Sequence, residues 1–129
     1  IQNLVVYRTD DLAVMLNRYP YTNGHMLVIP RLHIDSMTGL PAEFRRSSMD
    51  ALVICEMILR KDFMAQGVNV GLNLGEAAGA GIADHLHWHI LPRWYGDTNF
   101  STVVGRLRVV PETLEESFAR IFESFKQYT

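Results

Sequence analysis

The segment HLHWHILP, residues 85–92, constrains the fold of this chain more than any other part of the sequence. Histidine occupies every second position, as His85, His87 and His89, and apolar residues lie between them. A period of two is typical of a β-strand, because successive side chains of a strand point to opposite faces of the sheet. We therefore expect a strand here, with three imidazoles on one face and an apolar face buried against a helix.

Short apolar runs bounded by Gly, Pro, Asn or polar residues predict four further strands. They cover residues 3–7, 13–16, 24–30 and 68–74. After Pro41, which suits the first turn of a helix, apolar residues recur at helical spacing from Phe44 to Phe63. The sequence therefore predicts one long helix between the third and fourth of these strands.

A second helix is predicted at the end of the chain. Thr113, with Glu116 three residues later, is typical of a helix start with a capping box. We expect this helix to bury five apolar side chains: Leu114, Phe118, Ile121, Phe122 and Phe125. Strands, a helix, strands and a helix, in that order, favour an antiparallel α+β sheet over a parallel βαβ array.

Composition narrows the classes of function. With 129 residues, 48% of them hydrophobic, the chain can form one domain over residues 1–129 with its own core. A net charge of -2 argues against nucleic-acid binding by phosphate neutralisation. No apolar run approaches the roughly 18 residues of a membrane span. The single Cys55 cannot form an internal disulfide, which fits a reducing cytoplasm, and its place in the helical pattern predicts a core position.

A row of imidazoles suits phosphate chemistry. Alternate residues on a strand are roughly 6.5 to 7 Å apart, so three rings cannot all bind one ion through bonds of about 2 Å, although a neighbouring pair could. The ordinary histidine pKa of about 6.5 leaves a neutral ring that can attack phosphorus beside a protonated ring that can donate to phosphate oxygens. The alternatives are histidines that only fill a polar face and a pair that binds a metal.

The segment before the histidines, GLNLGEAAGAG, is rich in glycine. Gly75, Gly79 and Gly81 would let backbone N–H groups approach anionic oxygens, and the Asn73 amide can donate to a phosphate oxygen. A plain turn is the alternative. Because the segment leads directly into the histidines, we interpret it as a phosphate-binding loop.

These residues together resemble a known family. HLHWHIL matches the H-φ-H-φ-H-φ-φ signature of the histidine triad (HIT) superfamily, in which φ is apolar. MLNRYPYTNGHMLVIPRLH resembles the first strand pair of that family, and GLNLGEAAGAG resembles its phosphate loop. PRWYGDTNF resembles the segment after the triad in a bacterial branch that includes diadenosine tetraphosphate phosphorylases. The resemblance runs from Asn3 to the C-terminal helix.

The resemblance implies a HIT-like α+β fold, with a five-stranded antiparallel sheet and two main helices, that pairs into a homodimer. It implies that His87 is the nucleophile and that His89 contacts the phosphate or ribose region. His85 would support the site, and His25 would orient the triad by hydrogen bonding. Asn17 matches a ribose-binding residue, and its plainer interpretation is an Asn that forms a turn.

The sequence departs from the family pattern in two places. Many relatives carry Ser or Thr, which donates to the leaving group, where this chain has Ile82. Some relatives bind a structural zinc through a C-x-x-C pair, a histidine like His33 and the first triad histidine. No cysteine precedes Cys55 here, so such a zinc would need ligands from an upstream segment.

We therefore expect a cytoplasmic nucleotide hydrolase or nucleotidyltransferase that needs no cofactor for catalysis. It would cleave a dinucleoside polyphosphate or a similar adenylylated substrate at the α-phosphate, through a nucleotidyl-histidine intermediate. Phosphorolysis of diadenosine tetraphosphate, with inorganic phosphate as the acceptor, is the alternative within the family. A nucleotide-binding module with little turnover and a metalloenzyme are the alternatives from other classes. Neither nucleic acid nor a membrane is expected as a partner.

Overall fold

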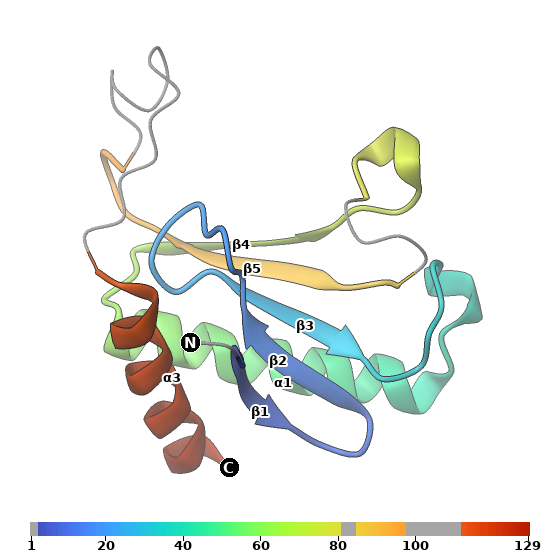
Figure 1. The fold of residues 1–129 in the computed structure, drawn as a ribbon, viewed down its shortest axis with the longest axis horizontal. Helices are drawn as coiled ribbons and strands as arrows, with labels where there is room; N and C mark the ends of the chain where they lie inside the picture. The colour runs from blue at the N-terminus through green and yellow to red at the C-terminus, as the bar shows by residue number, and fades with distance from the viewer. Residues whose placement is uncertain (1–2, 81–84, 98–111) are drawn as a thin grey trace.

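In the computed structural model, residues 3–80, 85–97 and 112–129 are described. Within them the chain forms one antiparallel sheet in the order β1-β2-β3-β5-β4 (Figure 1). The strands are β1 (Val5–Arg8), β2 (Leu12–Leu16), β3 (Met26–Pro30), β4 (Gly67–Leu72) and β5 (Trp88–Arg93). This sheet, with two main helices, confirms the expected α+β fold.

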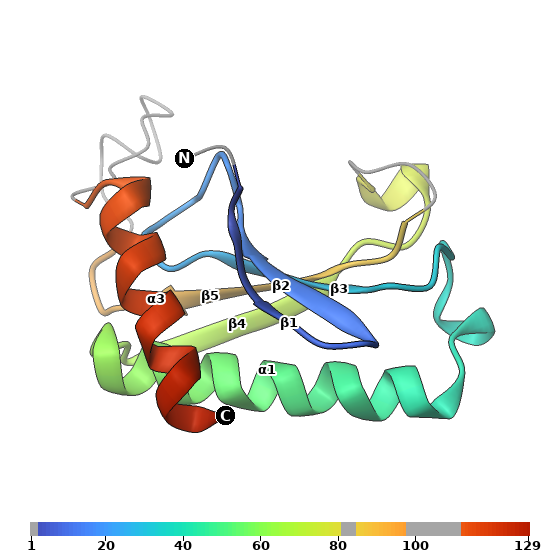
Figure 2. The ribbon, with the colours of Figure 1, turned by 60° about the horizontal axis from the view of Figure 1, so that its bottom comes forward.

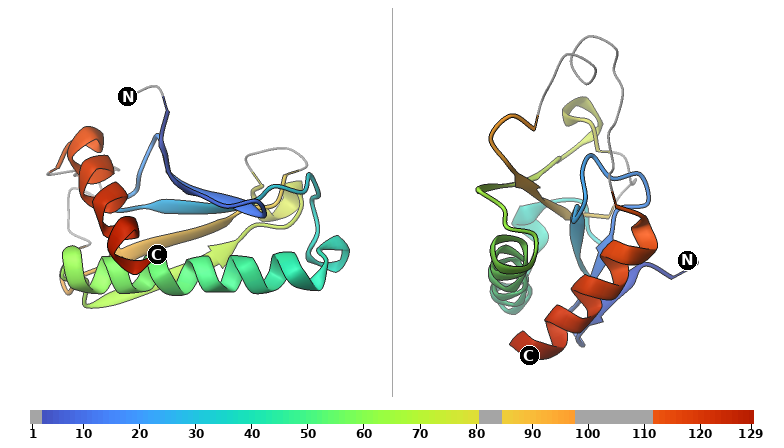
Figure 3. Two further views of the ribbon diagram at one scale, coloured as in Figure 1. Left: turned by 90° about the horizontal axis from the view of Figure 1, so that it is seen from below. Right: turned by 90° about the vertical axis from the view of Figure 1, so that its left-hand side faces the viewer.

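The long helix α1 (Ala42–Asp62) runs along one face of the sheet, as Figure 2 shows, and contacts β2, β3, β4 and β5. The helix α3 (Leu114–Tyr128) crosses the C-terminal end of α1 and packs on β1 (Figure 3). Side chains of α3 join the two helices, because Arg120 and Ser124 both hydrogen-bond to Asp62 at the end of α1. Two short 3₁₀ helices, η1 (Met37–Gly39) and η2 (Glu76–Ala78), lie in loops.

The hydrophobic core lies between α1 and the sheet. It takes alternate strand residues, which fits the period of two. The fully buried members include Val14, Leu16, Met26, Val28, Ile90, Cys55, Ile58 and Leu59. Cys55 is thus a core residue as expected, and burial raises the pKa of its thiol. Within the described segments, no helix has the length and apolar character that crossing a membrane requires.

The C-terminal helix begins as expected but buries fewer aromatic residues than expected. The Thr113 side chain accepts a hydrogen bond from the Glu116 N–H at 3.1 Å, which is the predicted cap. Ile121 and Phe125 are buried, whereas Phe122 is 39% exposed, so its predicted burial is wrong. Phe122 instead stacks on Phe118 along the helix, because the apolar stripe is wider than the surface that α1 and β1 cover.

The strand that carries the histidines begins at Trp88, so its expected start at His85 is wrong. The ladder between β3 and β5 ends where Val28 pairs with Trp88, and two more residues would place Pro30 opposite Leu86. Proline has no N–H to donate to a neighbouring strand, so the pairing stops there. His85 and His87 therefore precede the strand, and the three histidines do not share one regular strand face.

Gly24, at the entrance to β3, provides a test of the packing between the sheet and α1. Its φ is +84°, and a Cβ there would lie 2.9 Å from Cδ2 of Leu59, which is fully buried. We expect Gly24→Ala to lower the free energy of unfolding by about 2 to 4 kcal/mol, from backbone strain plus overpacking. Urea denaturation measures this change.

Gly96→Ala is the matched control, because Gly96 has φ of +76° but nothing within 4 Å of the added Cβ. It should cost only the backbone strain, about 1 kcal/mol. Equal losses for the two variants would contradict the packing argument.

Candidate active site

His89 lies at the centre of the sheet face opposite α1. The strand register pairs it with Leu27 of β3 on one side and with Gly71 of β4 on the other. Directly paired residues of antiparallel strands share a face, so Leu27 and Gly71 flank His89 there. A Cβ added to Gly71 would meet nothing within 4 Å, so the β4 side of His89 is open.

His25, which precedes β3 and is 1% exposed, holds His89 by a hydrogen bond. His25 Nε2 and His89 Nδ1 are 3.0 Å apart. The Tyr21 backbone N–H donates to His25 Nδ1 at 3.3 Å, so that nitrogen is the acceptor of the neutral ring. Nε2 of His25 therefore carries the hydrogen and donates it to His89 Nδ1. Because His89 Nδ1 accepts this hydrogen bond, the neutral His89 ring carries its own hydrogen on Nε2.

The pKa of His89 is lowered from its ordinary value, first by burial and then by the neighbouring His87. A lowered histidine pKa favours the neutral ring at pH 7. The ring is then a directed N–H donor rather than a cation, which matches the tautomer that His25 imposes.

His87 is held in the complementary tautomer. Its Nδ1 lies 3.1 Å from the backbone oxygen of His85, and a carbonyl can only accept, so Nδ1 carries the hydrogen. Nε2 of His87 is left with a lone pair. The ring is 7% exposed and meets the His89 ring edge to face, with centroids 5.0 Å apart. In their neutral forms, the two neighbouring rings thus offer a lone pair on His87 Nε2 and an N–H donor on His89 Nε2.

His85 is tied to the end of β3 and does not face His89. Its Nε2 donates to the Pro30 carbonyl at 2.8 Å, and its ring stacks on His33 with centroids 5.0 Å apart. The first histidine therefore anchors the segment whose carbonyl holds His87. His25 and His87 both contact His89, whereas the His85 ring contacts His33 and the Pro30 carbonyl.

Asn17 lies beside His25, at the end of β2. Its Nδ2 is 3.4 Å from His25 Nδ1, and its backbone N–H donates to the His25 carbonyl at 3.0 Å. Its Oδ1 also accepts from the Tyr19 N–H at 3.3 Å, as an Asn that forms a turn does. Both interpretations from the sequence fit this geometry, because the turn places the amide at the site.

The glycine-rich loop is held mainly by its own backbone. The Gly79 N–H donates to the Glu76 carbonyl at 2.9 Å and closes the η2 turn, and the predicted place of Gly79 in a phosphate loop stays a prediction. Asn73 Nδ2 lies 3.4 Å from the Gly79 carbonyl, a long bond on an exposed side chain. Gly81 and Ile82 lie outside the described residues.

Two features of the site were missed in the sequence. The sequence pattern did not indicate Tyr21, whose ring stacks on His25 with centroids 5.0 Å apart. An aromatic residue in the turn directly before GH was the available signal. On β4, Asn69 accepts from Arg93 Nη1 at 2.9 Å, and Arg93 also pairs with Asp97 at 2.6 Å, a network of residues distant in sequence.

The fold matches solved histidine triad structures. A zinc-bound histidine triad family protein from Mycobacterium smegmatis superposes with a TM-score of 0.80 at 28% identity, over 99% of this chain and 87% of that chain. A HIT-like protein from Bartonella henselae, described as involved in cell-cycle regulation, superposes with a TM-score of 0.78 at 27% identity, over 96% of this chain and 88% of that one.

The residues present here do not complete a zinc site like that implied for some relatives. Across the described residues, no group of three His, Cys, Asp or Glu side chains is placed to hold a metal ion. His33 and His85 stack on each other, and His85 Nε2 is engaged by Pro30. Two histidines alone fall short of the four ligands of structural zinc.

Sequence relatives include enzymes of dinucleotide metabolism. A protein of Mycobacterium tuberculosis named AP-4-A phosphorylase is 38% identical over 120 residues, 90% of this chain and 60% of that protein. A bis(5'-nucleosyl)-tetraphosphatase of Schizosaccharomyces pombe is 30% identical over 100 residues, 78% of this chain and 54% of that protein. The chain thus spans less than two thirds of the length of either relative.

The family model described as the HIT domain matches residues 1–95, which include all five strands of the described sheet, α1, the glycine-rich loop and all five histidines. This match covers more than half of the chain and agrees with the solved structures and with the geometry of His25, His87 and His89. The chain therefore belongs to the HIT family.

Proposed function

We propose that this chain transfers the nucleotidyl group of a dinucleoside polyphosphate, or a similar adenylylated substrate, to water through an intermediate on His87. The observation that carries the proposal is the pair of fixed tautomers, with a lone pair on His87 Nε2 beside an N–H on His89 Nε2. The names of the relatives from M. tuberculosis and S. pombe support dinucleoside polyphosphates as the substrate class.

In the first step, His87 Nε2 attacks the α-phosphorus. A P–N bond forms while the P–O bond to the departing polyphosphate breaks, and the electron pair leaves with that oxygen. The ring becomes cationic, and the His85 carbonyl, which accepts from Nδ1, stabilises the new charge. In the second step, water attacks phosphorus and the P–N bond breaks. The electron pair of that bond returns to His87 Nε2, which restores the neutral ring, and the proton lost by the attacking water passes to solvent.

The other site residues have supporting roles in this proposal. His89 donates to an α-phosphate oxygen, where negative charge develops in the transition state. His25 orients His89, His85 anchors the segment that holds His87, and Asn17 binds the ribose. Gly79 and Gly81, which lack a Cβ, would let the backbone of the phosphate loop approach the anionic oxygens.

Phosphorolysis is the second candidate, and the relative named AP-4-A phosphorylase favours it. Both reactions share the intermediate on His87 and differ in the acceptor that attacks next. A binding module with little turnover would form no intermediate, so a burst of nucleotidylated protein distinguishes it from an enzyme.

The remaining parts of the proposal concern the setting of the site. We propose a single domain over residues 1–129, because α3 packs on both α1 and β1. We propose cytoplasmic catalysis without a metal cofactor, since His87 supplies the nucleophile.

The nucleophile is tested by His87→Ala. Turnover of diadenosine tetraphosphate should fall by about 10⁴-fold or more, because removal of a nucleophile leaves only binding and positioning. The dissociation constant for the nucleotide should change little. Steady-state kinetics and calorimetry measure the two effects. His33→Ala, which alters an exposed histidine outside the pair, should keep most of the turnover, and a His87→Ala protein that stays active would refute the assignment.

The homodimer is tested by light scattering. Val70 of β4 is 53% exposed, and Met49 and Val53 on α1 are 60% and 49% exposed, which is a large apolar area for a monomer surface. We expect twice the monomer mass of 14.7 kDa at micromolar concentration. Val70→Lys, which charges the edge of the sheet, should shift the population toward monomer. A wild-type mass of 14.7 kDa would contradict the dimer.

The acceptor is tested by adding phosphate to the reaction with diadenosine tetraphosphate. A hydrolase gives AMP and ATP, whereas a phosphorylase gives ADP and ATP. If phosphate is an acceptor, ADP should replace AMP among the products when millimolar phosphate is present. Asn73→Ala should restore AMP, because the amide that would donate to the inorganic phosphate is lost. Chromatography of the products decides, and simple inhibition by phosphate with AMP retained would leave water as the acceptor.

A further inference from the structure

A cavity of ≈ 370 Å³ lies beside His89, between the loop after β2 and the strands β5 and β4. Its walls are Tyr21 of the loop after β2, His89 and Leu91 of β5, residues 69–72 of β4, and Asn73 directly after that strand. The volume lies in the range of small-molecule sites, about 300 to 1,000 Å³. Two of its lining residues, His89 and Asn73, also belong to the proposed reacting site, and the proposed reaction at His87 gives no role to the other walls.

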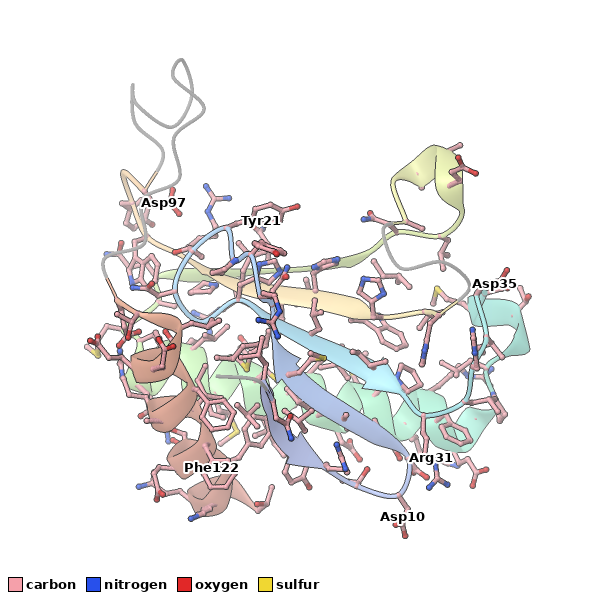
Figure 4. All side chains as sticks on the ribbon, in the orientation of Figure 1. Asp10, Tyr21, Arg31, Asp35, Asp97 and Phe122 are labelled. Atoms are coloured by element: carbon pink, nitrogen blue, oxygen red, sulfur yellow. The ribbon has the colours of Figure 1, made fainter. Side chains whose placement is uncertain are left out.

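Tyr21 gives the cavity an aromatic wall. The ring stacks on His25 at an interplanar angle of 22°, and the side chain is nevertheless 60% exposed. His25 is in turn bonded to His89, so the ring is held rigidly against the site. Figure 4 shows Tyr21 rising from its loop beside β4 and β5. A fixed, exposed aromatic ring is a surface on which a nucleobase stacks.

The opposite wall is polar and also fixed. Asn69 Oδ1 accepts from Arg93, and Arg93 is held by two bonds to Asp97, so the Asn69 amide is oriented by residues that do not belong to the reacting site. With its oxygen engaged, Asn69 presents its NH₂ group as a donor to acceptor nitrogens of a base. Gly71 between these walls leaves room for a flat group.

The position of the cavity identifies its occupant. In the sheet order β2-β3-β5-β4, the histidine strand lies between the side of Asn17 and the side of β4. A dinucleoside polyphosphate also has two nucleosides, one on each side of the reacting phosphate chain. Resting on the proposed function, with the transferred nucleoside at Asn17, we propose that this cavity binds the second nucleoside, the one on the leaving group, and that its base stacks on Tyr21.

Binding to the His87→Ala protein tests the proposal without requiring turnover. Diadenosine tetraphosphate is compared with adenosine 5'-tetraphosphate, which has the same number of phosphates and lacks the second nucleoside. We expect the dinucleotide to bind about tenfold more tightly, within the range for stacking of one base on an aromatic side chain. Adding Tyr21→Ala should remove most of that difference, and adding Tyr21→Phe should keep it. Calorimetry measures the six affinities, two ligands against three proteins.

Two further variants separate the cavity from the loop. Tyr19→Ala is the matched control, because Tyr19 is in the same loop, is 72% exposed and does not line the cavity. It should leave the tenfold preference intact. Gly71→Val fills the floor of the cavity without touching Tyr21 and should weaken the dinucleotide selectively.

The outcomes are distinct. If Tyr21→Ala lowered the affinity for both ligands equally, the Tyr21 ring would act only by positioning His25. That result would overturn the proposal. Equal affinity of the His87→Ala protein for the two ligands would also overturn it. Selective binding that depends on Tyr21, in a protein whose wild-type form shows no turnover, would support this cavity while refuting the proposed catalysis.

Discussion

The backbone of Pro30 carries an acceptor but no donor, and the geometry of the site follows from that. The missing N–H ends the ladder between β3 and β5 at Val28 and Trp88. The carbonyl that remains binds the His85 side chain, which anchors the segment before β5 outside the sheet. Because that segment is not in a ladder, the His85 carbonyl can turn to His87 Nδ1. A regular strand would have directed this carbonyl to a neighbouring strand instead.

The site needs no charged residue to distinguish its two central histidines. Backbone groups that can only donate or only accept a hydrogen bond determine both tautomers. The Tyr21 N–H can only donate and makes His89 an N–H donor through His25, whereas the His85 carbonyl can only accept and leaves His87 with a lone pair. Two imidazole rings thereby acquire different chemistry, and the lowered pKa of His89 favours its neutral form, which donates an N–H.

The sequence predicted the order of elements, because that order depends on local periodicity and turn residues. The roles of His87, His89 and His25 were implied by the family resemblance and stay predictions. The sequence placed the start of β5 at His85, since alternation of side chains alone cannot show where a partner strand stops donating. It missed the exposure of Phe122, which depends on how much of α3 the rest of the fold covers. It also missed Tyr21 and Asn69, because their roles come from contacts between β5, β4 and the loop after β2.

The leaving nucleotide and the acceptor use the same line of approach to the phosphorus bound to His87. The affinity of the cavity for the leaving nucleotide therefore also affects the entry of the acceptor. The polyphosphate leaves opposite to Nε2, and the acceptor must enter along the same line to release the intermediate. It therefore enters beside the cavity of Tyr21, where the leaving nucleotide has just been. A wall that bound this nucleotide very tightly would delay the acceptor and make product release limit turnover. The exposure of Tyr21 and Asn69 fits a moderate affinity, enough to select a dinucleotide while the product still leaves.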